Sequence, residues 1–221
     1  LGNVYRALGR HEDALAAFQK AIQLDPKLAA PWHGLGNVYY DLGRHEEALA
    51  AYQKAIQLDP QFAAPWNGLG NVYADLGRHE EALAAFQKAI QLDPQFAYPW
   101  NGLGNVYYDL GRHEEALAAY QKAIQLDPQF AYPWHGLGTV YRDLGRHEEA
   151  LAAFQKAIQL DPQFAYPWNG LGNVYYQQGR HEEALAAFQK AIQLDPQFAS
   201  PWNGLGTVYR DLGRHEEALA A

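Results

Sequence analysis

A histidine followed by two glutamates is the first candidate for chemistry in this sequence. The segment His45–Leu49 opens like the His-Glu-x-x-His helix of zinc proteases, but Leu49 stands where the second histidine ligand would be. The segment Gly34–Tyr39 begins like a dinucleotide-binding loop, yet Tyr39 replaces the third glycine and no strand is predicted before it. Cysteine is absent and serine occurs only at Ser200. We therefore expect no enzyme, no metal site and no cofactor.

The composition argues against several classes of partner. Of the 221 residues, 48% are hydrophobic and 19% are charged, which favours a folded chain over a disordered one. A net charge of −8 argues against binding to nucleic acid or to an anionic membrane, because both need a positive surface. No apolar run approaches the ~20 residues of a membrane span, and no signal peptide is present. The cytoplasm fits best, and the first residue, Leu1, indicates a fragment, a processed form or an engineered chain.

The elements that would position these residues repeat along the whole chain. The six tryptophans recur every 34 residues, and an Asp-Pro pair keeps the same step. A period of this length is typical of stacked supersecondary units. We therefore predict one array and no other domain over residues 1–221, with partial repeats at 1–28 and 199–221 and full repeats at 29–62, 63–96, 97–130, 131–164 and 165–198.

One full unit predicts a pair of helices. Trp32, Leu35 and Tyr39 recur at helical spacing in its first half, and Gly43 is typical of the residue that follows a helix C-terminus. Apolar residues recur at the same spacing in the second half until Asp59-Pro60, where proline disfavours a helical conformation in the residue before it. The tryptophans occur in every copy on the packing stripe, so we expect them in the core.

Nine residues of the unit carry a family resemblance. They are Trp32, Leu35, Gly36, Tyr39, Gly43, Ala48, Tyr52, Ala55 and Pro60. In type and spacing they resemble the signature of the tetratricopeptide repeat family. The resemblance implies an all-α fold, an α-solenoid in which antiparallel helix pairs form a right-handed superhelix, and a role in binding peptides or protein partners. Two residues depart from the family pattern, His45 and Gly34; we expect Gly34 beside the binding groove and Gly36 toward the second helix.

The copies differ mainly at five positions, which are 2, 5, 9, 12 and 13 when Ala29 is counted as position 1. These positions project along one stripe of the first helix, nearly opposite the packing stripe. Neutral drift would also alter the exposed side of the second helix, which is nearly constant, so we favour a functional groove. The resemblance implies that this stripe lines the concave groove. The predicted groove residues are Tyr98, Asn101, Asn105, Tyr108, Asp109, Tyr132, His135, Thr139, Arg142, Asp143, Tyr166, Asn169, Asn173, Tyr176 and Gln177.

The residue types on this stripe narrow the ligand. Tyrosine combines a large contact area with a polar group, and asparagine can donate to and accept from a peptide backbone. Packed helices lie about 10 Å apart and an extended peptide advances about 3.3 Å per residue, so one repeat would contact roughly three peptide residues. Lysine never occupies position 5, so clamping of a terminal carboxylate is not supported. We expect an extended, neutral to mildly basic peptide or protein segment.

Three other functions stay open at this point. Half-repeats at both ends without polar caps could stack end to end between molecules, which would make a self-assembling rod. Helical repeats can also read single-stranded RNA, although the net charge of −8 argues against it. The array could instead be the non-catalytic arm of a larger enzyme, such as a glycosyltransferase.

Overall fold

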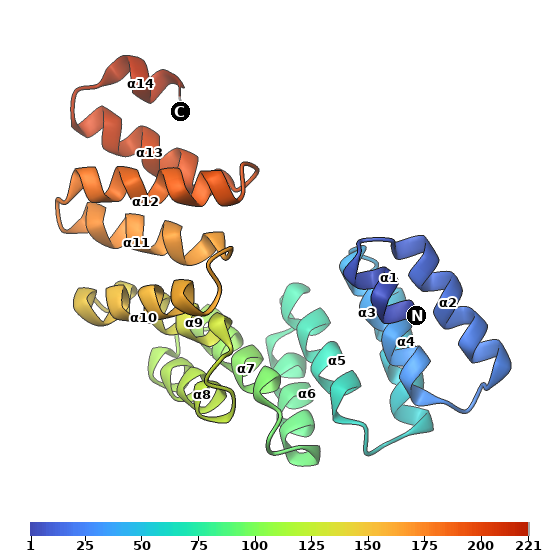
Figure 1. Cartoon of the computed structure of the whole chain (residues 1–221). Coiled ribbons are helices and arrows are strands. Elements are labelled where there is room, and N and C mark those ends of the chain that lie inside the picture. The colour runs from blue at the N-terminus through green and yellow to red at the C-terminus, as the bar shows by residue number, and fades with distance from the viewer. Residues whose placement is uncertain (221) are drawn as a thin grey trace. The chain divides into compact units, whose positions relative to one another are not determined.

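The computed structural model of this chain describes residues 1–220, and every regular element within them is an α-helix. Figure 1 shows these helices in chain order as successive hairpins. None of the described helices is long and apolar enough to cross a membrane. The helices are α1 (Gly2–Ala7), α2 (His11–Leu24), α3 (Ala29–Asp41), α4 (His45–Leu58), α5 (Ala63–Asp75), α6 (His79–Leu92), α7 (Ala97–Asp109), α8 (His113–Leu126), α9 (Ala131–Asp143), α10 (His147–Leu160), α11 (Ala165–Gln177), α12 (His181–Leu194), α13 (Ala199–Asp211) and α14 (His215–Ala220).

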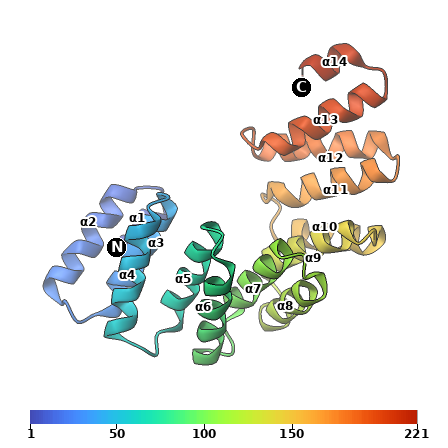
Figure 2. The same ribbon diagram turned by 180° about the vertical axis from the view of Figure 1, so that it is seen from behind.

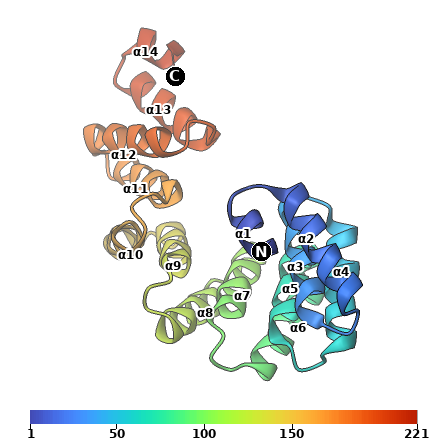
Figure 3. The same ribbon diagram turned by 45° about the vertical axis from the view of Figure 1, so that its right-hand side comes forward.

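The chain forms two compact units, Leu1–Val106 and the part from Tyr107 onward. In the first unit each helix from α1 to α6 packs against the next, and α3 also contacts α1 and α5. In the second unit the same succession runs from α8 to α14, and α11 also contacts α9 and α13. Figures 2 and 3 show the hairpins α3–α4 and α11–α12 from other sides. The odd-numbered helices, which are the first helices of the repeats, therefore lie next to one another within each unit.

A glycine turn joins the first helix of each repeat to the second. Gly43 has a φ of +68°, a left-handed conformation that glycine adopts without steric cost. The amide of Gly43 donates to the carbonyl of Tyr40 at 2.9 Å, and the amide of Arg44 donates to that of Tyr39 at 2.8 Å. The Arg44 guanidinium lies 4.5 Å from the centre of the Tyr39 ring and its Nε donates to Glu47 at 2.9 Å. The predicted end of the first helix at Gly43 is confirmed.

An aspartate turn joins each repeat to the next. The amide of Asp59 still donates to the carbonyl of Ala55 at 2.9 Å, and the Asp59 carboxylate accepts from the amide of Gln61 at 3.0 Å. The amide of Phe62 then donates to the carbonyl of Asp59 at 3.2 Å. The turn is closed by its own backbone and side chain, which is a common use of aspartate before proline. The turn places Phe62 directly before the following first helix, α5.

The core of the array lies between repeats. One buried cluster combines Ala14, Leu15 and Phe18 of α2 with residues of α3 and α4, among them Leu35 and Ala51. The other clusters repeat this composition one unit further along. Each repeat therefore completes its apolar core with the second helix of the repeat before it, as expected for a solenoid.

Two glycines enclose the large aromatic ring of the second helix. A Cβ added to Gly36 would lie 2.6 Å from the Tyr52 ring of the same repeat, and a Cβ added to Gly68 would lie 2.5 Å from the same ring. At such distances an added side chain would force the ring to move, so glycine on both sides permits this close packing. The prediction that Gly36 faces the second helix is confirmed. Gly34 also allows close packing, because it is buried against the Phe18 ring of the preceding repeat; its position beside a binding groove stays a prediction.

Candidate functional site

The variable positions of the repeat lie on the first helices, and we call the surface they form within each unit the first-helix face. Three tyrosines at position 2 are its most exposed large hydrophobic side chains: Tyr98 and Tyr132 are each 54% exposed and Tyr166 is 50% exposed. Each stands in the first turn of its helix, α7, α9 or α11. Position 2 is alanine at Ala30 and Ala64, so the exposed rings belong to the middle of the chain.

In the second unit the position-2 tyrosines join a row of rings that the sequence reasoning missed. Neighbouring ring centres along Phe130, Tyr132, Phe164, Tyr166 and Phe198 are 5.7, 4.7, 5.7 and 4.5 Å apart, and all four pairs are tilted. We call these five residues the aromatic strip. Each phenylalanine is the residue directly before a first helix. Because phenylalanine is constant at the repeat junctions of the second unit, comparison of the copies could not mark it as part of a site.

His135 lies beneath the aromatic strip. Its ring centre is 5.4 Å from that of Phe164, 6.0 Å from that of Tyr166 and 5.7 Å from that of Phe154 in α10. Burial, reinforced by the positive charge of Arg142, lowers the pKa of His135 to about 4. At neutral pH the imidazole is therefore uncharged, and it supports the two outer rings as an aromatic side chain.

The amide side chains at positions 5 and 9 differ in their exposure. Asn101 and Asn169 are half-buried, and the amide oxygen of each is buried with no hydrogen-bond partner among residues 1–220. At position 9, Asn105 is exposed and Asn173 is half-buried. Thr139 instead donates its hydroxyl to the carbonyl of His135 at 3.1 Å. These side chains therefore do not form one uniform row.

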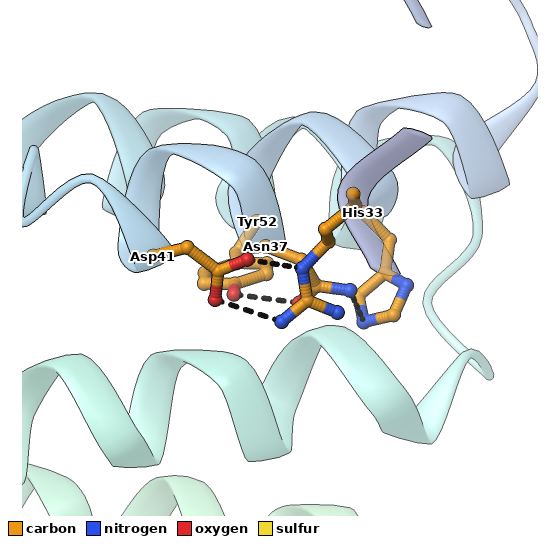
Figure 4. Close-up of polar contacts among 5 residues, drawn as sticks. His33, Asn37, Asp41 and Tyr52 are labelled. Atoms are coloured by element: carbon orange, nitrogen blue, oxygen red, sulfur yellow. Dashed lines mark hydrogen bonds and ion pairs between the residues drawn. The ribbon is translucent and has the colours of Figure 1, made fainter. Parts of the chain in front are cut away.

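The first unit shows how the second helix changes this face. In Figure 4 the Tyr52 hydroxyl donates to the Asn37 amide oxygen at 2.8 Å, and the amide nitrogen of Asn37 lies 3.4 Å from Nε2 of His33. Nearby, Arg6 donates from Nη2 to the Asp41 carboxylate at 2.8 Å. The polar groups at positions 5 and 9 of this repeat are thus bonded to each other, and position 13 bonds to the arginine at position 12 of the preceding repeat. Where phenylalanine replaces Tyr52, the hydroxyl donor is absent.

Positions 12 and 13 connect successive repeats. The Tyr108 hydroxyl donates to the Asp143 carboxylate at 2.6 Å, and Arg142 donates from Nε to the same carboxylate at 2.8 Å. Burial and the bond to Asp143 raise the pKa of Tyr108 to about 12. Tyr176 bonds in the same way to Asp211 at 2.6 Å. The opposite charges on this part of the face therefore largely neutralise each other.

Two of the predicted residues at position 13 are exposed. Asp109 ends α7 and Gln177 ends α11. Gln177 stands in the repeat that follows Arg142, where the other copies of this position mostly have aspartate. Arg142 pairs instead with Asp143 of its own helix.

The tryptophans lie on the opposite side of the first helices. Trp134 and Trp168 are half-buried and pack against the core clusters, which confirms their place on the packing stripe. They also border cavities of about 530 and 350 Å³ between second helices. Ile124 with Trp134 and Tyr141 lines the larger cavity, and Ile158 with Trp168 and Tyr175 lines the smaller one. The sequence reasoning missed these cavities.

The histidines that begin the second helices are not grouped with other ligands. The His113 ring lies 6.0 Å from the Tyr108 ring, and the His181 ring lies 5.9 Å from that of Tyr176. Over the described part of the chain, no three histidine, aspartate or glutamate side chains come together in a way that could hold a metal ion.

Comparison with known proteins identifies the class of this fold as a stack of helical hairpin repeats. The family described as "TPR repeat" matches residues 2–43, 36–77 and 70–111, and the "Cilia and flagella-associated protein 70 C-terminal domain" matches residues 100–221. The chain belongs to the tetratricopeptide repeat family, as its signature residues predicted. No curated protein sequence gives a significant match.

Solved structures agree with this assignment. The APC/C hetero-tetramer Cut9-Hcn1 has a TM-score of 0.87 at 22% identity, over 94% of this chain but only 41% of the other. Pseudomonas aeruginosa PilF has a TM-score of 0.76 at 22% identity, over 87% of both chains. YrrB, described as a TPR protein with an unusual peptide-binding site, is 30% identical over 84% of this chain and 95% of its own, with a TM-score of 0.57. The first two show the fold alone, whereas YrrB is similar in sequence as well.

Proposed function

We propose that this chain is a non-catalytic scaffold that binds an extended peptide or a segment of a partner protein on the first-helix face. The observation that carries the proposal is the exposure of Tyr98, Tyr132 and Tyr166 in three consecutive repeats. Tyrosines combine a large contact area with a polar group and are enriched at protein interfaces. The packing positions of the same helices are constant, so the repeats differ where a partner would touch them.

The similarity to YrrB supports a peptide as the ligand. YrrB is described as having a peptide-binding site and is 30% identical to this chain. The face of this chain also offers groups suited to a peptide backbone. The amide groups of Asn101 and Asn169 each keep a buried oxygen without a partner among the described residues. Because such an unpaired group costs free energy, a small rotation that lets it accept from a ligand N–H would be favourable.

The charge of the face supports a neutral to mildly basic ligand. Asp143 already accepts from Tyr108 and Arg142, and this arrangement leaves neither a strong anion site nor a strong cation site there. Asp109 on α7 is exposed and adds a negative charge. The net charge of −8 disfavours acidic partners at long range.

Binding to an array of random peptides tests this function. The intact chain is compared with a variant carrying Tyr98→Ala, Tyr132→Ala and Tyr166→Ala, changes that the repeat tolerates at Ala30 and Ala64. A control variant carries Gln87→Ala and Gln121→Ala at exposed positions of second helices. We expect the tyrosine variant to lose most peptide binding and the control to keep it. Equal binding by all three proteins would contradict the proposal, and so would binding of single-stranded RNA alone.

Self-association stays a separate prediction. It requires that the mass in solution rise with protein concentration, which sedimentation equilibrium measures directly. The tyrosine variant distinguishes the two ideas, because stacking between repeat ends does not use position 2. A role beside a catalytic domain in a larger enzyme is compatible with the proposed binding and would add to it.

A further inference from the structure

The aromatic strip carries an inference about the kind of peptide that binds. It rests on the proposed function, since it concerns the same face. We infer that the strip binds a proline-rich segment in the polyproline II conformation. The strip runs along the N-terminal ends of α9, α11 and α13, and each of its five rings contacts the next.

The spacing of the rings is close to the period of a polyproline II helix. The centres of Tyr132 and Phe164 are 4.7 Å apart and those of Phe164 and Tyr166 are 5.7 Å apart. The two exposed tyrosines are therefore separated by no more than about 10 Å. A polyproline II helix has three residues per turn and rises 3.1 Å per residue, so one face recurs about every 9 Å. A proline on every third residue would meet one tyrosine after another.

The chemistry of the aromatic strip also suits a proline-rich ligand. Proline rings pack well on aromatic faces, and polyproline II segments commonly dock in grooves lined by aromatic side chains. Proline has no N–H to satisfy, so the ligand needs few acceptors from the protein. The tyrosine hydroxyls can donate to the ligand carbonyls, which a polyproline II helix leaves unpaired. The polar pair of Arg142 and Asp143 lies at the other end of α9 and is not required.

The charges around the aromatic strip also bear on the ligand. The turns that carry the strip each contain an aspartate, Asp127, Asp161 or Asp195, whose carboxylate accepts from the backbone amide two residues later at 3.0 Å. Lysine and arginine are absent from residues 126–141 and 160–175, which include the strip's first two turns and both tyrosines. Negative charge beside an uncharged aromatic surface favours a proline-rich ligand that also carries basic residues.

The strip is specific to part of the array. In the first two full repeats, 29–62 and 63–96, alanine stands at position 2 (Ala30 and Ala64) in place of tyrosine. The Phe62 ring still packs on His33, with ring centres 5.2 Å apart, as Phe164 packs on His135. The same repeat fold is therefore present without the exposed tyrosines, and this provides a natural control for the contribution of the rings.

Calorimetric titration of the full chain tests the inference. The probe is a decaproline peptide with one lysine at each end, and the comparison peptide has the same length and lysines but alternating glutamine and serine. We expect the proline peptide to bind more tightly. Tyr132→Ala with Tyr166→Ala should weaken its binding about tenfold. A control variant, Gln87→Ala with Gln121→Ala, changes exposed residues of second helices and should leave its affinity unchanged.

The outcomes distinguish the inferred proline-rich ligand from the proposed peptide-binding function. If the proline peptide does not bind at about 1 mM, the inference is overturned, and it is also overturned if the glutamine-serine peptide binds equally well. The latter result would leave the proposed function intact. A β-linked oligosaccharide that binds through Tyr132 and Tyr166 while the proline peptide does not would also overturn it. Far-ultraviolet circular dichroism and an unchanged thermal midpoint check that the strip variant is folded, as Ala30 and Ala64 lead us to expect.

Discussion

His135 and the asparagines that replace it in neighbouring repeats occupy the same position with different consequences. Burial lowers the pKa of both His33 and His135 to about 4, from the ordinary value of about 6.5. In the unfolded chain these histidines take up a proton as the pH falls below about 6.5, whereas in the folded chain they do not. The free energy of unfolding therefore falls as the pH drops from roughly 6.5 to 4. Above that range the neutral histidines cause no such loss.

Replacing His135 by asparagine, the residue present at Asn101 and Asn169, should remove its share of this loss. We expect the free energy of unfolding to fall less between pH 7 and pH 4.5 in His135→Asn than in the original chain, by about 2 kcal/mol. Urea titrations at the two pH values measure the difference. The carboxylates contribute equally to both proteins and cancel. An identical pH dependence would show that the imidazole is solvated in the folded state.

At Gly170 a neighbouring aromatic ring leaves no room for a side chain. A Cβ added there would lie 2.5 Å from the Phe154 ring. Gly170→Ala gains about 1 kcal/mol of helix propensity, but the ring must move, and we expect a net loss of about 1–3 kcal/mol of stability. Chemical denaturation gives the value. In a Phe154→Leu background the loss should shrink, and a stabilising effect of alanine in the original chain would contradict the placement of the ring.

At the scale of the helices, the bonds between positions 12 and 13 hold neighbouring first helices in register. The Tyr108 hydroxyl donates to Asp143 across one repeat, at 2.6 Å. Both side chains are partly exposed, so we expect Tyr108→Phe to lower the free energy of unfolding by only about 0.5–1 kcal/mol. The acid-base titration of tyrosine absorbance should also lose one component above the ordinary tyrosine range, because burial and Asp143 raise the pKa of Tyr108 to about 12. If neither measurement changed, the expected contribution of the Tyr108–Asp143 hydrogen bond would be contradicted.

Local signals in the sequence predicted the helices but not all of their neighbours. Gly43 and Asp59-Pro60 marked the helix ends because their backbone preferences act within one turn. The neighbour of Gly34 is a ring from the previous repeat, and that contact depends on how hairpins stack. The aromatic strip was missed for a related reason: Phe130 and Phe164 look like simple junction residues until the stacking places them beside Tyr132 and Tyr166. Whether the predicted groove residues bind a peptide stays a prediction.

At the scale of the whole molecule, stability should grow with the number of repeats. Each buried cluster joins two neighbouring repeats, so an internal repeat contributes its own folding cost and one interface. Deleting residues 131–164 would bring together two repeats whose packing residues are equivalent. We expect a folded protein with a lower urea midpoint and a smaller m-value. Loss of all cooperative unfolding would contradict nearest-neighbour stability, and a second copy of residues 131–164 should raise the midpoint.

The enclosure of each second-helix ring by two glycines has a consequence for the gene. The ring belongs to one repeat and one of its glycines belongs to the next, yet every copy supplies the same pair of surfaces. Recombination between misaligned copies that preserves the repeat frame therefore recreates an intact junction at the crossover. The number of repeats can change by whole units without any compensating substitution. Selection can then act on position 2 alone, adding or removing exposed tyrosines while the packing stays as it was.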